Sequence, residues 1–178
     1  MDQSEPVMNS ALKTILLGVG ILLINAPTQA QTWIWHGDGD GSRSFVRKQF
    51  HVSNRVRSAE LRVCADDSAK VYLNGKALSE SAGTSKPLKA DVTSRLRLGR
   101  NVLAAEATNA DGPRGVVALL IVTLVSGKRQ IVATDITWKA APHNSVGWFE
   151  LEFDDSKWKS ATMIAPHGAK PWGAVLLK

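Results

Sequence analysis

The feature that most constrains the fold is an alternation of apolar and polar residues, in a chain without long segments of helical period. Across residues 58–65, apolar side chains occupy every second position, and most of the positions between them are polar or charged. This two-residue period is typical of a strand with one buried face. Residues 46–52 also place their apolar side chains on one face. The almost unbroken apolar run 116–125 predicts a central strand that is covered on both sides.

Turn signals divide the chain between these segments. Asn74-Gly75 follows a short strand pattern and predicts a hairpin, because both residues tolerate positive φ. The remaining elements that the pattern predicts are a single helical turn after residue 91 that Gly99 stops, a strand over 102–109, a turn at 126–128 that leads into a strand over 130–134, and a last strand over 174–177. The sequence therefore predicts an all-β fold, an antiparallel β-sandwich of roughly seven or eight strands.

Residues 1–30 have the features of a signal peptide. Lys13 precedes the apolar run Ile15–Ile24, and small residues lead to Ala30, after which we expect cleavage. The apolar run is shorter than the roughly 20 residues that a membrane-spanning helix needs, so we expect no stable membrane span after cleavage. The prediction is one sandwich domain over residues 31–178, located outside the cytoplasm, either secreted or periplasmic.

The charge and the single cysteine limit the kinds of partner and site. Cys64 has no second cysteine to pair with, so we expect its thiol to be buried. The chain carries a formal net charge of +6. Its basic residues are scattered in short groups, such as Arg95 with Arg97 and Lys128 with Arg129, without interleaved aromatic residues. We interpret them as a solvated surface and predict no nucleic-acid partner.

Several strings of residues are similar to those of a known family. Cys64-Ala65-Asp66-Asp67, then Val71–Lys76, then residues 91–103, resemble in order and spacing the galactose-binding-like jelly rolls that precede the catalytic domains of bacterial α-L-rhamnosidases. Phe153–Trp158 resembles the Asp-Asp-Ser-x-Trp signature of similar sugar-binding modules in the β-galactosidase and β-glucuronidase group. The resemblance spans nearly all of residues 31–178. It implies a jelly-roll sandwich with an accessory, non-catalytic role.

Catalytic motifs are absent from the sequence. It has no His-Glu-x-x-His, no Gly-x-Ser-x-Gly, no phosphate-binding glycine-rich loop and no Cys-x-x-Cys. Asp154 and Asp155 are adjacent, whereas an acid and base pair needs carboxyls on opposite sides of a substrate. The family resemblance implies that these residues form a structural corner that Trp158 closes. We predict that the chain is not an enzyme.

Four aspartates suggest a calcium site. If strands 45–52 and 56–65 run antiparallel, the loop before the first and the loop after the second lie at the same end of the sandwich. Asp38, Asp40, Asp66 and Asp67 then lie close together, and carboxylates are ligands that Ca²⁺ prefers. Galactose-binding-like domains often carry such an ion. The alternative is a solvated acidic loop balanced by Arg43, because residues 36–42 lack a ligating glutamate at the required distance.

Sugar binding calls for an exposed aromatic ring that stacks on a pyranose. Trp138 and Trp148 lie in a loop-rich stretch, so we predict them as stacking platforms. The leading hypothesis is an exported, non-catalytic carbohydrate-binding module whose partner is a carbohydrate or glycoconjugate. The alternative is a structural or protein-interaction sandwich that docks on another envelope protein.

Overall fold

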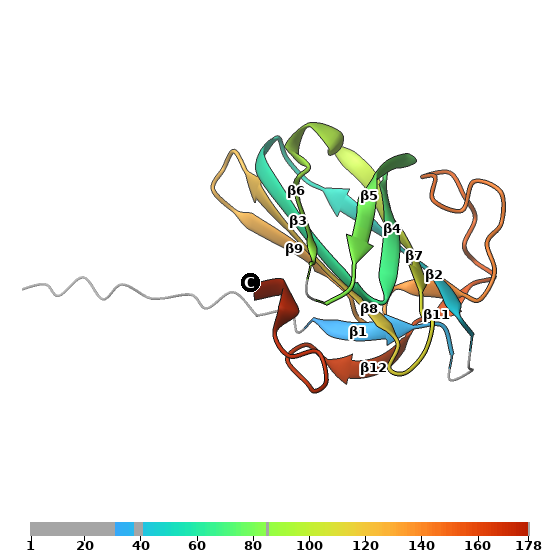
Figure 1. Ribbon diagram of the computed structural model, residues 1–178. Helices are drawn as coiled ribbons and strands as arrows, with labels where there is room; N and C mark the ends of the chain where they lie inside the picture. Colours follow the sequence, from blue (N-terminus) through green and yellow to red (C-terminus); the bar gives the residue numbers. More distant parts are fainter. Residues whose placement is uncertain (1–30, 38–40, 85, 178) are drawn as a thin grey trace, which may run out of the picture.

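The computed structural model describes residues 31–37, 41–84 and 86–177. The predicted signal peptide lies outside this range. The described residues form two antiparallel sheets that pack face to face (Figure 1), which confirms the predicted all-β sandwich. The first sheet contains β12 (Thr162–Pro166), β1 (Thr32–Trp35), β8 (Gly115–Leu124), β3 (Val56–Asp66) and β6 (Leu88–Asp91) in that order, with β9 (Arg129–Ala133) also paired to β8. The second sheet contains, in order, β11 (Lys159–Ser160), β10 (Lys139–Ala141), β2 (Arg43–Val52), β7 (Gly99–Thr108), β4 (Ser68–Leu73) and β5 (Lys76–Ala82).

The apolar residues of the alternating pattern in β3 face the core between the two sheets. Leu61 and Val63 are 0% and 1% exposed there, and Trp35 and Trp138 fill the same layer. The long apolar run forms β8, with β3 along one edge and with β1 and β9 along the other. Its residues alternate between the inter-sheet core and a second apolar cluster on the outer side of the first sheet. Burial on both faces explains why the run is apolar at nearly every position.

The predicted turns are also present. Asn74 and Gly75 have φ values of 52° and 80° and close the hairpin between β4 and β5. The predicted helical turn is a short 3₁₀ helix, η1 (Thr93–Arg95), and Gly99 begins β7 with a φ of 88°. Within the described residues, no helix is long and apolar enough to span a membrane.

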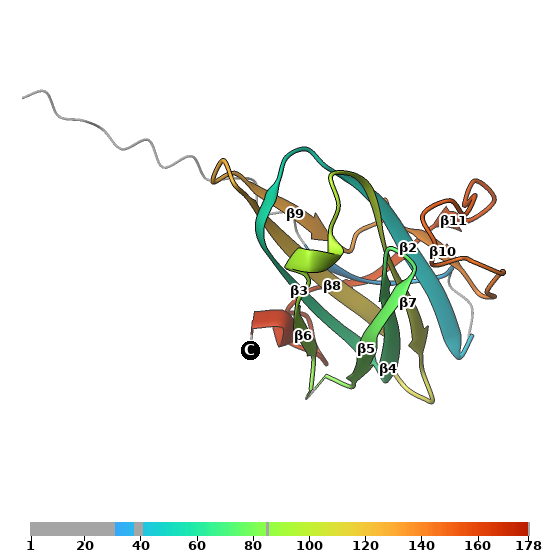
Figure 2. The same cartoon turned by 90° about the horizontal axis from the view of Figure 1, so that it is seen from above.

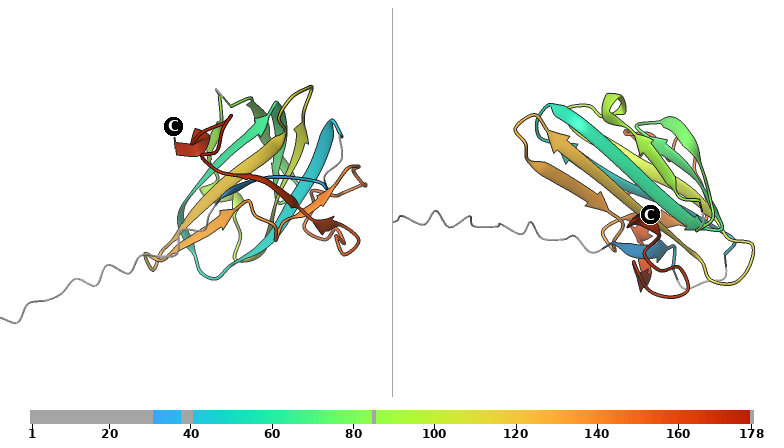
Figure 3. Two further views of the ribbon diagram at one scale, coloured as in Figure 1. Left: turned by 90° about the horizontal axis from the view of Figure 1, so that it is seen from below. Right: turned by 60° about the vertical axis from the view of Figure 1, so that its left-hand side comes forward.

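The predicted last strand over residues 174–177 is wrong. This segment forms a second 3₁₀ helix, η2 (Val175–Leu177), which lies against the outer side of the first sheet (Figure 3). Val175 and Leu176 are both buried, whereas consecutive residues of a strand point to opposite faces. The backbone of Leu176 forms hydrogen bonds with side chains and not with a neighbouring strand. Its N–H donates to His167 Nε2 at 3.2 Å, and its carbonyl accepts from the Arg62 guanidinium at 2.5 Å.

Cys64 lies under this C-terminal segment, in the same apolar cluster as Trp33 and Trp172. Its thiol is buried, as predicted. Burial, with a smaller contribution from Asp66, raises the pKa of the Cys64 thiol to about 12. The thiol is therefore neutral at physiological pH and acts as a small apolar side chain.

Candidate functional site

The loops that the sequence analysis places together do meet, although the connection differs from the expected one. The 53–55 link crosses from the second sheet to the first, so β2 and β3 are not neighbours in one sheet. The loop before β2 and the segment after β3 still meet at the β7–β8 loop, at the lower end of the molecule in Figure 1. Asn109 N–H donates to Ser42 O at 2.8 Å, and Asp67 N–H donates to Thr108 O at 2.6 Å. We call residues 36–37, 41–42, 66–68 and 109–114 the acidic end.

Asp67 and Asn109 are the polar centre of the acidic end. The exposed Asp67 carboxylate accepts the Ala110 N–H at 2.7 Å. The side-chain amide of Asn109 lies against three backbone carbonyl oxygens, those of Pro113 at 2.8 Å and of Asp66 and Asp111 at 3.2 Å each. An NH₂ group turned toward them has two hydrogens for three acceptors. The Asn109 amide therefore already pairs with these three carbonyls, and the exposed Asp67 carboxylate is a ligand of the kind that Ca²⁺ prefers.

Asp66 points to another part of this end. Its carboxylate accepts the Trp172 indole N–H at 2.7 Å, and the Trp172 ring stacks on Trp33 at a centroid distance of 4.4 Å. Burial raises the pKa of Asp66. The nearby Asp67 and Asp111 carboxylates raise it further, whereas the hydrogen bond from Trp172 lowers it. Negative charge is therefore costly at this position unless a cation lies nearby.

The structure describes half of the predicted metal set. Asp66 and Asp67 are adjacent at the acidic end, while Asp38 and Asp40 lie outside the described residues. Among the residues that are described, no group of three or more His, Cys, Asp or Glu side chains could hold a metal ion. The convergence of all four aspartates stays a prediction. Sequence reasoning missed Asn109, although the turn-forming run Asn109–Pro113 between two strong strand patterns was the available signal.

The predicted stacking platforms are buried. Trp138 is 1% exposed in the inter-sheet core, and its indole N–H donates to Ala133 O at 2.7 Å. Trp148 is 3% exposed and packs edge-on against Phe45 and Tyr72, on the outer side of the second sheet. Neither ring offers a face to a sugar in this structure, so the expectation of exposed platforms is wrong. The loop-rich stretch folds back over the second sheet and buries Trp148 there, whereas Trp138 is buried between the two sheets.

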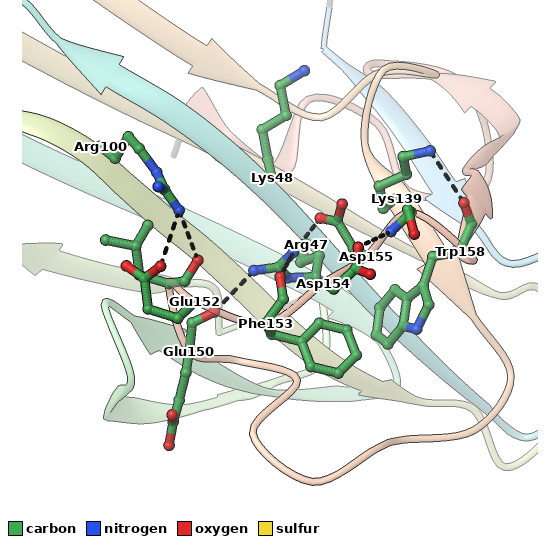
Figure 4. Close-up of polar contacts among 12 residues, drawn as sticks. Arg47, Lys48, Arg100, Lys139, Glu150, Glu152, Phe153, Asp154, Asp155 and Trp158 are labelled. Atoms are coloured by element: carbon green, nitrogen blue, oxygen red, sulfur yellow. Dashed lines mark hydrogen bonds and ion pairs between the residues drawn. The ribbon is translucent and has the colours of Figure 1, made fainter.

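The Asp-Asp-Ser-x-Trp segment forms a corner around a buried arginine (Figure 4). Arg47 of β2 is fully buried and forms an ion pair with Asp155. The Arg47 guanidinium also donates to Glu150 O at 2.9 Å and lies 5.3 Å from the centre of the Phe153 ring. Burial lowers the pKa of Arg47, and the charge of Asp155 opposes that shift.

Asp154 and Trp158 complete the corner. Asp154 accepts the Ser156 N–H at 2.9 Å, and this bond lowers the pKa of Asp154. Trp158 packs against Trp148 in the aromatic cluster. Both carboxylates are therefore engaged in holding the chain, as the structural interpretation predicts. Sequence reasoning missed Arg47, because in an alternating strand it reads as a solvent-facing residue.

The described residues thus define an antiparallel β-sandwich domain with polar loops gathered at one end. The chain is 32% identical to an α-L-rhamnosidase of Streptomyces avermitilis over 86% of this chain and 16% of that enzyme. It is 25% identical to an α-L-rhamnosidase of an Alteromonas species over 71% of this chain and 20% of that enzyme. The chain therefore spans about a fifth or less of these relatives. No protein-family model matches it.

Solved structures also match the chain to an α-L-rhamnosidase and, in addition, to a lectin. The S. avermitilis α-L-rhamnosidase complexed with L-rhamnose matches with a TM-score of 0.75 and 30% identity, over 82% of this chain and 16% of that one. The Pleurotus ostreatus lectin in complex with GalNAc matches with a TM-score of 0.73 and 28% identity, over 82% of this chain and 45% of that one. These matches confirm the predicted resemblance to a β-sandwich domain of α-L-rhamnosidases.

Proposed function

We propose that this chain is an exported, non-catalytic domain that binds carbohydrate at the acidic end of the sandwich. The observation that carries the proposal is the match, over 82% of this chain, to a lectin in complex with GalNAc. A similar match covers only 16% of a rhamnosidase complexed with L-rhamnose, which leaves most of that enzyme without a counterpart here. A small saccharide such as L-rhamnose or GalNAc is accordingly the ligand class.

The acidic end supplies groups of the right chemistry. The exposed Asp67 carboxylate accepts hydrogen bonds from sugar hydroxyls, and the side-chain oxygen of Asn109 is a further acceptor. We propose that Ca²⁺ binds here, with Asp67 as a ligand. Asp38 and Asp40 are further candidate ligands from outside the described residues. A cation at this place would also relieve the cost of the Asp66 charge.

Calorimetric titration with L-rhamnose and with GalNAc, in calcium and in EDTA, tests the proposal. We expect binding in calcium and its loss in EDTA. Asp67→Asn retains an acceptor for the Ala110 N–H and should weaken binding at least about tenfold, a cost of roughly 1.4 kcal/mol. Asn109→Ala should have a similar effect. The matched control is Asp91→Asn, which changes an exposed carboxylate that caps Thr93 N–H near η1.

Each part of the proposal has its own contrary outcome. Binding that persists in EDTA refutes the calcium. Binding that Asp67→Asn and Asn109→Ala leave intact refutes the location. If the chain binds neither sugar, nor any glycan on an array, the proposed carbohydrate ligand is refuted and the predicted protein-interaction role is favoured. Mass spectrometry of protein collected outside the cytoplasm tests export, with a new N-terminus at residue 31 as the expected result.

A further inference from the structure

Basic residues that are scattered in the sequence meet at the end of the sandwich opposite the acidic end. Three segments form this end: residues 53–57, where the link from β2 enters β3, residues 92–100 around η1, and residues 125–129, where the β8–β9 turn enters β9. Val125 N–H donates to Arg55 O at 2.9 Å, and the Arg57 side chain donates to Val125 O at 2.8 Å. Figure 2 shows all three segments from above. The fold therefore brings together basic residues that are far apart in the sequence.

This surface, which we call the basic end, carries Arg55, Arg57, Arg95, Arg97, Arg100, Lys128 and Arg129, all of them exposed. Several carboxylates lie near these residues: Glu60 and Asp91 line one hollow with Arg129, and the Glu150 side chain lies against Gly75. Glu152 is 3.5 Å from Arg100, and Asp91 accepts the Thr93 N–H. Among the described residues, no carboxylate forms an ion pair with the other arginines or with Lys128. The basic end thus presents a strong, largely uncompensated positive charge.

A small pocket opens within the basic end. It has a volume of about 200 Å³ and lies between the β4–β5 turn and η1. Its lining residues are Leu73, Asn74, Lys76, Ser94, Arg95, Leu96 and Arg97. Arg95, Arg97 and Lys76 are therefore at the pocket, and residues of this kind are the ones that bind phosphate.

Two apolar side chains project among these charges. Leu98 is 72% exposed between Arg97 and Arg100, and Val125 is 44% exposed at the β8–β9 turn. A soluble polyanion would neutralise the arginines but would leave Leu98 and Val125 in water. An anionic bilayer satisfies both, because its phosphates pair with the cations while its acyl boundary accepts the apolar tips.

We propose that the basic end docks on the surface of an anionic phospholipid membrane. Leu98 and Val125 enter the boundary between headgroups and acyl chains, and the arginines and Lys128 contact the surrounding phosphates. The pocket at Arg95 and Arg97 receives the phosphate of one headgroup. Docking in this orientation points the acidic end away from the bilayer.

Co-sedimentation of the full chain with phosphatidylcholine vesicles, with and without phosphatidylglycerol, tests this docking. We expect binding that needs phosphatidylglycerol and weakens with salt. Each basic residue near such a surface contributes about fivefold in affinity, so Arg95→Ala combined with Arg97→Ala should weaken binding about 25-fold. Leu98→Ser should weaken it about 50-fold, because roughly three carbon atoms no longer leave water.

Matched controls lie elsewhere on the surface. Val146→Ser changes a fully exposed apolar residue of another loop, and Lys157→Ala combined with Lys170→Ala removes two exposed lysines outside the basic end. Both should bind as the parent chain does. A second readout uses an environment-sensitive dye on Leu98→Cys, whose emission should rise and shift to the blue on vesicles. Cys64 is buried and does not compete for the label.

Three outcomes would overturn the proposal. In the first, the parent chain does not bind vesicles that contain phosphatidylglycerol. In the second, it binds but the Leu98 and Arg95/Arg97 variants bind equally well, which would assign the membrane contact to another part, such as residues 1–30. In the third, heparin or DNA binds more tightly than the vesicles and Leu98→Ser has no effect, which would identify a soluble polyanion as the partner.

Discussion

Replacing Arg47 by methionine tests whether this buried arginine holds the 142–158 segment on the second sheet. The substitution leaves the Asp155 carboxylate without its ion-pair partner and removes the donor to Glu150 O. Loss of one member of a buried pair costs about 3–5 kcal/mol. The Asp155 side chain is 21% exposed, so water compensates part of this loss and the lower limit applies. Adding about 1 kcal/mol for the lost bond to the carbonyl, we expect destabilisation of about 4 kcal/mol.

Urea denaturation monitored by tryptophan fluorescence measures this change. With a slope of about 2 kcal/mol per molar urea, the midpoint should fall by about 2 M. Arg43→Met is the control, because Arg43 is also in β2 and also pairs with a carboxylate, Glu106 at 3.5 Å, but is 63% exposed. Its substitution should cost at most about 1 kcal/mol. Equal midpoints for the two variants would refute the idea that burial of Arg47 anchors the segment.

Three further predictions follow from particular contacts. Gly115→Ala places a Cβ 2.9 Å from the Trp33 ring and should lower the free energy of unfolding by about 1–3 kcal/mol, measured in urea; an unchanged value would mean that Trp33 moves freely. Asn74→Ala puts alanine at a φ of 52° and removes the bond to Val102 N–H, so it should cost about 2 kcal/mol in the same assay, and no loss would mean that the turn relaxes. Burial lowers the pKa of His167 from its usual value of 6.5, so the unfolded chain binds a proton at a higher pH than the folded chain does. The free energy of unfolding should therefore fall as the pH drops below about 6.5. His167→Gln should flatten this part of the plot of stability against pH, and an unaltered plot would show that His167 does not titrate.

Much of the fold could be predicted from local pattern. The two-residue period predicts the strands with one buried face. The Asn74-Gly75 pair predicts the hairpin, because both residues tolerate a positive φ. The 174–177 segment could not be assigned correctly, because short apolar runs fit a strand and a packed 3₁₀ helix equally well. What decides between them is a distant partner: Arg62 and His167 take up the backbone groups of Leu176 that a strand would pair.

The candidate site was harder to predict than the fold. Antiparallel geometry placed Asp66 and Asp67 at the correct end, but the direction of each side chain depends on distant residues. Asp66 turns to Trp172, and Asp67 turns to the backbone of residue 110. Burial of Trp148 likewise depends on how a long loop folds over a sheet, and burial of Trp138 depends on how the two sheets pack. Side-chain exposure in such a loop is a tertiary property that has no local sequence signal.

The two ends of the sandwich divide the proposed roles between them. Carboxylates and carbonyl oxygens gather where the β7–β8 loop meets residues 66–68, and arginines gather around η1 and the β8–β9 turn. A single rigid sandwich would thus hold the proposed sugar site and the proposed membrane surface at opposite ends. Variants at one end should leave the other function intact, since the core lies between them.

Sugar binding at the acidic end is tested most directly by following backbone amide resonances of the isotopically labelled full chain while L-rhamnose and GalNAc are added in calcium. We expect the shifts to concentrate at Asp67 and at residues 109–111, with little change at residues 95–98. The absence of shifts with either sugar, or shifts confined to the basic end, would contradict the proposed sugar site.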